Sequence, residues 1–146
     1  MTTRENIGLL LSLASARGVA SATAALRPVD LSTRSYTLLE LVIDSGGTSQ
    51  RELADALRLD PSQIVALVDG LEERGLAQRR PNPEDRRQKS VVATTEGRKV
   101  FRQARKLIDA SLEEFLGDLD ADERDTLRAL LTRIVRPNRH SLVNAG

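Results

Sequence analysis

Two helix-start signals stand eleven residues apart in the middle of the chain, at Ser49 and at Asp60. Glu52 follows Ser49 at the third position, and Asp60 is followed by Pro61 and then, at the third position, by Gln63. A small polar residue with Glu or Gln three positions later is typical of a helix N-terminus, and proline suits the first helical position. Two helices that begin so close together leave room only for a tight turn between them. The sequence therefore predicts a helix-turn-helix.

The apolar residues of the second of these helices fall on one stripe, which predicts the face that packs against the rest of the fold. The stripe contains Ile64, Leu67, Val68 and Leu71. Gly75 stands where a helix C-terminus is expected. The remaining positions form the outer face, and they are Pro61, Ser62, Gln63, Val65, Ala66 and Asp69. A surface helix with small polar residues would show the same pattern, so this face alone does not identify a binding site.

The hydrophobic period then changes from helical to alternating. Residues 76–80 and 89–94 read as short strands, and residues 81–88 between them form a polar loop with two prolines. Two short strands around a charged turn predict a β-hairpin. Because proline cannot donate to a strand ladder, Pro81 predicts that this hairpin is an edge ribbon.

Further helices flank this centre and predict a mainly α fold with a small β-hairpin wing. A long apolar helix is expected over residues 4–27, ended by Pro28, and Ser32 caps a helix that Gly46 ends. A long helix follows from Thr95, and a last helix runs from Asp120 to Pro137. We expect one domain over residues 1–146, with a winged lobe at 31–95 and with dimerisation helices and a tail at 1–30 and 96–146.

Charge is segregated along the chain, although the net charge is only +1. Residues 74–106 contain eleven basic and three acidic side chains, a net charge of +8, whereas residues 1–73 sum to −4 and residues 107–131 to −6. A solvated helix face is one interpretation of such a block. A local electrostatic footprint for nucleic acid is the other.

Composition excludes several classes of chemistry. The chain has no Cys and one His, His140, so we expect no thiolate metal site, thiol switch, histidine-based catalysis or cofactor. The four aspartates between residues 118 and 125 lack the glycine and the closing glutamate of a calcium loop, and we interpret them as a helix cap and a solvated face. No phosphate loop or nucleophile elbow is present, which argues against an enzyme. Arg17 and several serines interrupt residues 7–26, so we expect no membrane span and a cytoplasmic protein.

A helix-turn-helix followed by a basic hairpin is a winged helix-turn-helix, in which the second helix enters the DNA major groove. Gln63 could read adenine through its amide, and Val65 could touch a thymine methyl. In the wing, Arg86 and Arg87 could enter a narrow minor groove, with Asp85 bracing one guanidinium. Further contacts are expected from Lys89 in the wing and, to phosphates, from Ser49, Arg51 and Arg74. A solvated turn is the competing interpretation of the wing.

Four segments carry a family resemblance, and they are Gln50-Arg51-Glu52-Leu53-Ala54, the run from Leu67 to Leu76, Glu84-Asp85-Arg86-Arg87, and Thr94-Thr95-Glu96-Gly97-Arg98. Together they resemble the MarR family of bacterial transcriptional regulators. The resemblance implies a homodimer that binds double-stranded DNA at a pseudo-palindromic operator, acts as a repressor, and has a small-molecule effector site between the dimer helices and the lobe. Members often carry Thr or Ser followed by Arg where this chain has Val65-Ala66. The alternative is a winged-helix interaction module that no longer binds DNA specifically.

Overall fold

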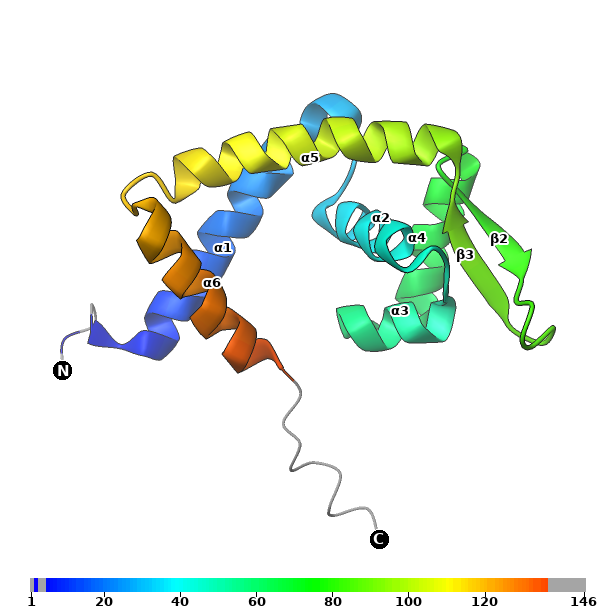
Figure 1. Cartoon of the computed structure of the whole chain (residues 1–146), viewed down its shortest axis with the longest axis horizontal. Coiled ribbons are helices and arrows are strands. Elements are labelled where there is room, and N and C mark those ends of the chain that lie inside the picture. The colour runs from blue at the N-terminus through cyan, green and yellow to red at the C-terminus, as the bar shows by residue number, and fades with distance from the viewer. Residues whose placement is uncertain (1, 3–4, 137–146) are drawn as a thin grey trace, which may run out of the picture.

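The computed structural model describes residue 2 and residues 5–136, which form six α-helices and a small antiparallel sheet at one end of the molecule (Figure 1). His140 and Pro137 lie outside the described residues. In chain order the elements are α1 (Ile7–Ala25), the 3-10 turn η2 (Arg27–Val29), α2 (Thr33–Ser45), β1 (Thr48–Ser49), α3 (Gln50–Leu57), α4 (Pro61–Glu73), β2 (Ala77–Pro81), β3 (Lys89–Ala93), α5 (Thr95–Phe115) and α6 (Ala121–Val135). The predicted mainly α fold with a hairpin wing is confirmed.

Polar caps set most helix boundaries close to the predicted ones. The side chains of Ser32, Thr94 and Asp120 each accept a hydrogen bond from the amide three residues later. Gly46 ends α2 in the left-handed region at φ 72°, which suits glycine. The first helix is shorter than predicted, because Asn6 is its N-cap and the chain enters the η2 turn before Pro28.

The sheet has the strand order β1-β3-β2, which corrects the expectation of a two-stranded edge ribbon. β3 is central, because Thr48 and Ser49 pair with Val91 and Ser90 on its other side. Two residues are too few to show an alternating pattern, so β1 could not be predicted from the sequence. β2 is an edge strand as Pro81 predicts, and Pro81 lies at its end opposite Lys89.

The hydrophobic core belongs to the winged lobe. Leu26, Leu38, Leu39, Ile64, Val68 and Val91 are the centre of this core, each at most 1% exposed. Tyr36 and Phe101 stack across it, with ring centroids 5.2 Å apart. Gly97 allows α5 to start directly against Leu76, the residue before β2, since a Cβ at Gly97 would lie 1.9 Å from the Leu76 carbonyl oxygen. α5 is thereby fixed to the lobe at its N-terminal end.

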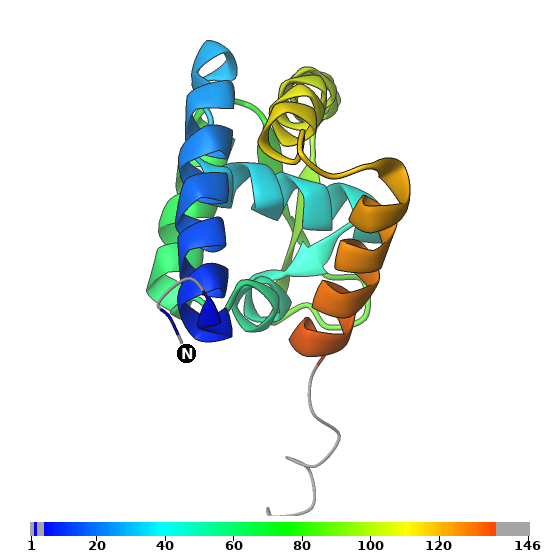
Figure 2. The same cartoon turned by 90° about the vertical axis from the view of Figure 1, so that its left-hand side faces the viewer.

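The remaining helices form two arms, α1 and α6, that extend from the other half of α5. In Figure 1, α5 runs along the top, the lobe hangs below its right half and the arms descend from its left half; Figure 2 shows the arms from that side. Neither α1 nor α6 contains a buried residue. By length and apolar composition α1 could cross a membrane, a test that helices of soluble proteins also pass, and here it packs along α5.

Candidate nucleic-acid interface

The outer face of α4 is the first part of the candidate interface. All six residues predicted for this face are exposed, and they are Pro61, Ser62, Gln63, Val65, Ala66 and Asp69. The predicted inner stripe is confirmed, with Ile64 and Val68 fully buried and Leu67 partly buried against the core. The Val65 side chain is 39% exposed, which offers an apolar contact on an otherwise polar face. The base contacts themselves stay predictions.

Gln63 is already engaged within α4. Its Oε1 accepts a hydrogen bond from the Asp60 backbone amide at 3.0 Å, which completes the predicted capping box. A bidentate contact with adenine uses both the oxygen and the nitrogen of a glutamine amide. Gln63 therefore has to exchange its cap bond for such a contact, while its Nε2 can donate to a base without that exchange.

Arg79 of β2, which the sequence pattern did not single out, connects three elements. Its side chain is only 15% exposed, and its guanidinium forms ion pairs with Asp69 at 2.7 Å and with Glu72 at 3.0 Å on α4. Nε donates to Gln50 Oε1 at 2.8 Å on α3, and Nη2 donates to the Val65 carbonyl oxygen at 3.3 Å. The Asp69 carboxylate is thus bound by Arg79, which corrects the expectation that it faces DNA freely.

The wing turn is ordered by backbone hydrogen bonds and leaves its cations exposed. Asp85 Oδ1 accepts from the Arg87 backbone amide at 3.0 Å, so Asp85 braces the turn and not a guanidinium as predicted. A short carboxylate reaches the amide two residues later with little strain. Arg86, Arg87 and Lys89 are exposed, and within the described residues their side chains form no ion pair or hydrogen bond.

One of the three predicted phosphate contacts, Ser49, is buried by the fold. Ser49 is 6% exposed, and its hydroxyl accepts from the Glu52 amide at 3.1 Å. The Glu52 carboxylate in turn accepts from the Thr48 hydroxyl at 2.6 Å, and not from the Ser49 amide as the capping box predicts.

Arg74 lies at the C-cap of α4, where Nη2 donates to the Val29 carbonyl oxygen at 3.0 Å and Nη1 donates to the Asp30 carbonyl oxygen. These bonds hold α4 against the turn that follows α1. The structure therefore withdraws Ser49 from the phosphate contacts, whereas Arg74 is exposed and stays a predicted contact, although its guanidinium also bonds within the fold. Arg51 is exposed on the first turn of α3 and stays a predicted contact.

A second cationic surface lies on α5. Its five exposed cations are Arg98, Lys99, Arg102, Arg105 and Lys106, and no acidic residue stands between Gly97 and Ile108. The opposite side of this segment is buried through Gly97, Phe101 and Ala104. In Figure 1, α5 lies at the end of the lobe from which the hairpin leaves, so the α5 cations and the wing tip occupy opposite ends. The basic block of the sequence therefore forms two exposed cationic surfaces, the wing turn and α5. Arg74 and Arg79, which belong to the same block, bond within the fold and hold α4 in place.

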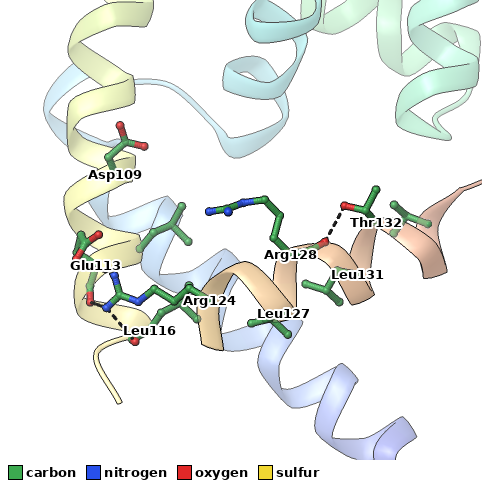
Figure 3. A pocket seen from close by; sticks show the side chains of 10 residues that line it. Asp109, Glu113, Leu116, Arg124, Leu127, Arg128, Leu131 and Thr132 are labelled. Carbon is green, nitrogen blue, oxygen red and sulfur yellow. Dashed lines mark hydrogen bonds and ion pairs between the residues drawn. The ribbon is translucent and has the colours of Figure 1, made fainter. Parts of the chain in front are cut away.

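A hollow of about 580 Å³ separates α5 from α6 (Figure 3). Its apolar lining includes Leu112, Leu116, Leu127 and Leu131. At the end of the hollow next to the α5–α6 connection, Arg124 forms an ion pair with Glu113 at 2.8 Å and donates to the Leu116 carbonyl oxygen at 3.1 Å. Within the described residues there is no group of three or more His, Cys, Asp or Glu side chains that could hold a metal ion.

Comparisons with known proteins agree with this geometry. The sequence model of the MarR family matches residues 29–88. The transcriptional regulator HosA of Escherichia coli is 30% identical over 106 residues, which cover 73% of this chain and 78% of HosA. CouR from Rhodococcus jostii, solved with p-coumaroyl-CoA bound, superimposes with a TM-score of 0.86 at 37% identity over 94% of this chain and 97% of CouR. A mutant MarR of E. coli in complex with operator DNA superimposes with a TM-score of 0.80 at 26% identity, over 89% and 94% of the two chains.

Proposed function

This chain belongs to the MarR family of transcriptional regulators, and from that premise we propose that it is a homodimeric, sequence-specific DNA-binding repressor. One observation carries the proposal, namely that the N-terminal end of α4 and the tip of the wing lie toward the same end of the lobe. β2 starts beside α5 and runs to the wing tip, while α4 ends just before β2 and so begins near the other end (Figure 1). One DNA duplex can meet both.

The proposal requires a dimer, and the arms supply its surface. Of the twelve large hydrophobic residues that are exposed in the described part of the chain, all but Val65 lie on α1, α5 or α6. Apolar surface of this extent marks an interaction site on a soluble chain. A two-fold symmetric dimer places two α4 helices on half-sites about 10 base pairs apart, so the operator is a pseudo-palindrome.

Members of this family are regulators and are generally not enzymes. We extend this to the present chain, which on our proposal has no catalytic activity, needs no cofactor and works in the cytoplasm, where chromosomal DNA is. The apolar face of α1 serves the dimer in this proposal and not a membrane.

The effector we propose is an acyl-CoA thioester. CouR, at 37% identity, was solved with p-coumaroyl-CoA bound. The exposed cations of α5 suit the several phosphate charges of coenzyme A, because guanidinium and ammonium groups are the usual protein partners of phosphate. An effector that binds better to one spacing of the two lobes shifts the dimer away from the DNA-binding arrangement.

Selection of bound duplexes from a random pool tests the DNA-binding function. We expect an enriched pseudo-palindrome, bound by the dimer with an affinity that falls steeply with salt, since phosphate contacts release counterions. Absence of any enriched duplex, together with salt-insensitive binding, would establish the interaction-module alternative.

A titration of the complex with the enriched duplex tests the effector. We expect p-coumaroyl-CoA to release the DNA at lower concentration than either free coenzyme A or p-coumarate, because only the thioester presents both the phosphates and the acyl group. Equal potency of coenzyme A and the thioester would show that the acyl group is not read. No release by any of the three would remove this class of effector and leave the DNA-binding function standing.

A further inference from the structure

Arg79 differs from every other arginine near the candidate interface in what surrounds it. Arg51, Arg80, Arg86 and Arg87 are exposed. The Arg79 side chain is 15% exposed, and its guanidinium donates to four acceptors on two helices. Its backbone amide also donates to Glu72 Oε2 at 3.0 Å. A guanidinium that already donates to four protein acceptors is not available as a phosphate contact. Its role therefore lies in the elements that it connects.

The acceptors on α4 lie along one side of the helix. Val65, Asp69 and Glu72 are spaced four and three residues apart, the spacing that places side chains on a common helical face. The planar fork of a guanidinium meets such acceptors in one orientation only. Arg79 therefore fixes the rotation of α4 about its own axis and its distance from the hairpin.

The apolar contacts of α4 do not fix this rotation equally well. Ile64, Val68 and Leu71 bury the inner stripe, but the hydrophobic effect is non-directional. A helix held only by a stripe can turn by some degrees at little cost, whereas the ion pair at 2.7 Å to Asp69 and the bond at 3.3 Å to the Val65 carbonyl are directional. The second of these bonds ends on Val65, which is itself one of the residues expected to face bases.

We propose that Arg79 is a positioning residue for sequence recognition: it sets the orientation of α4 relative to the wing and so determines base preference without touching DNA. This inference rests on the proposed DNA-binding function. The bond from Arg79 to Gln50 extends these contacts to α3, so that the two helices and the hairpin meet DNA as one rigid unit. Loss of the Arg79 contacts leaves the electrostatic contacts of the wing in place and misaligns the base contacts of α4.

The test compares the enriched duplex with a scrambled one across several salt concentrations, using wild type, Arg79→Lys, Arg79→Met and the control Arg80→Met. Arg80 is the exposed neighbour on the same strand, and its one side-chain bond is to Gln78 at 3.3 Å. We expect both Arg79 variants to lose at least tenfold in the affinity ratio between the two duplexes, with unchanged salt slope and unchanged affinity for the scrambled duplex. Lysine should not rescue the ratio, because it cannot reproduce the fork. Arg80→Met should keep the wild-type ratio.

Asp69→Asn by itself covers the case in which an Arg79 variant folds poorly, and a double-mutant cycle with Arg79→Met tests whether Asp69 acts through Arg79. Asp69 is exposed, so its substitution is not expected to disturb the core. If Asp69 acts through Arg79, Asp69→Asn lowers the affinity ratio in the wild-type background and has no further effect in Arg79→Met. An undiminished effect of Asp69→Asn in Arg79→Met would mean that Asp69 contacts DNA itself, which would overturn the positioning role.

The remaining outcomes separate the two proposals. A wild-type protein that shows no preference between any duplexes contradicts the proposed function. A wild-type protein with clear preference and Arg79 variants that keep it contradicts only the positioning role. Equal losses on both duplexes with a lowered melting temperature would show that Arg79 is merely structural, and would also overturn it.

Discussion

All sixteen buried apolar residues of the described chain lie between Leu26 and Ala104, whereas α1 and α6 contain none. The winged lobe thus buries its own apolar surface, with helices, sheet and the N-terminal half of α5 around one core. The arms expose theirs, from Ile7 at 73% to Val135 at 71%. Burial of one such side chain is worth roughly 1.5–3 kcal/mol. The lobe therefore carries its own core, whereas in the proposed dimer a second copy of the chain covers the apolar faces of the arms.

The same contrast recurs within the lobe, between α4 and the wing turn. α4 is held by its buried stripe, by Arg79 and by Arg74, and it contains no basic residue. The wing turn is held by hydrogen bonds within residues 82–88, two of them to the side chains of Asn82 and Asp85, and it presents Arg86 and Arg87. Geometric precision and electrostatic attraction are therefore assigned to different elements, and they can be removed separately.

The largest expected effect comes from substitutions that disrupt the dimer surface of the arms and leave the lobe folded. Leu131→Glu combined with Ile134→Glu places two charges on the exposed apolar face of α6, and we expect monomers in light scattering and a loss of at least about a hundredfold in operator affinity. Burying an unpaired charge in an interface costs far more than it gains. Ala129→Glu, on the opposite side of α6 by helical spacing, is the matched control. A double variant that remains dimeric would show that α6 is not part of the interface.

A substitution in the lobe core should lower the stability of the lobe and leave the dimer intact. Leu39 is fully buried, and Leu39→Ala should lower the free energy of unfolding by about 2–5 kcal/mol through lost burial and a cavity. The variant should remain dimeric at a temperature where the lobe is still folded. Denaturant unfolding followed alongside light scattering measures both quantities, and dissociation at unchanged stability would contradict the division between lobe and arms.

Removal of a wing arginine should change electrostatics alone. For Arg86→Ala or Arg87→Ala we expect the slope of log affinity against log salt to fall by about one per lost phosphate contact. The free energy of unfolding should stay within about 0.5 kcal/mol of wild type, since both side chains are exposed. Binding at several salt concentrations measures the slope. Wild-type affinity and slope in both variants would show that the wing does not carry the DNA contact.

Gln63 has two roles to separate, one in the helix cap and one in base reading. Gln63→Ala should relax preference at one base pair, keep the salt slope and destabilise the fold by up to about 1 kcal/mol, because the Asp60 amide loses its acceptor. Gln63→Glu keeps the acceptor, so it should relax the preference with little loss of stability. Unchanged preference in both variants would remove Gln63 from the base contacts.

The smallest expected effect is on the pH dependence of the stability of the lobe. Burial, together with the nearby Glu40 charge, raises the pKa of the Tyr36 hydroxyl. A raised pKa in the folded state favours the neutral form, so its contribution to stability is present below about pH 10, the ordinary pKa of tyrosine, and is lost as the pH rises above it. Wild type should therefore lose stability faster than Tyr36→Phe above that pH. Parallel pH dependences of the two melting temperatures would contradict this.

Much of the fold was predictable because its signals are local. Caps at Ser32, Thr94 and Asp120 bond to amides three residues away, and apolar stripes repeat every three or four residues, so short stretches of sequence determine where helices begin and which face they bury. The exposed face of α4 and the exposed wing arginines followed from the same reasoning. The two-residue strand β1 could not be predicted in this way, because only its pairing with β3, and no pattern in its own sequence, makes it a strand.

The roles of the individual charged residues were decided only in the folded chain. By sequence, Arg74, Arg79, Arg86 and Arg87 all belong to one basic block. The fold assigns Arg79 to Gln50, 29 residues away, and to Val65, 14 residues away, and it assigns Arg74 to Asp30, 44 residues away. Whether a cation faces solvent or braces a helix depends on which acceptors tertiary packing brings within about 3 Å of it, and neither composition nor periodicity contains that distance.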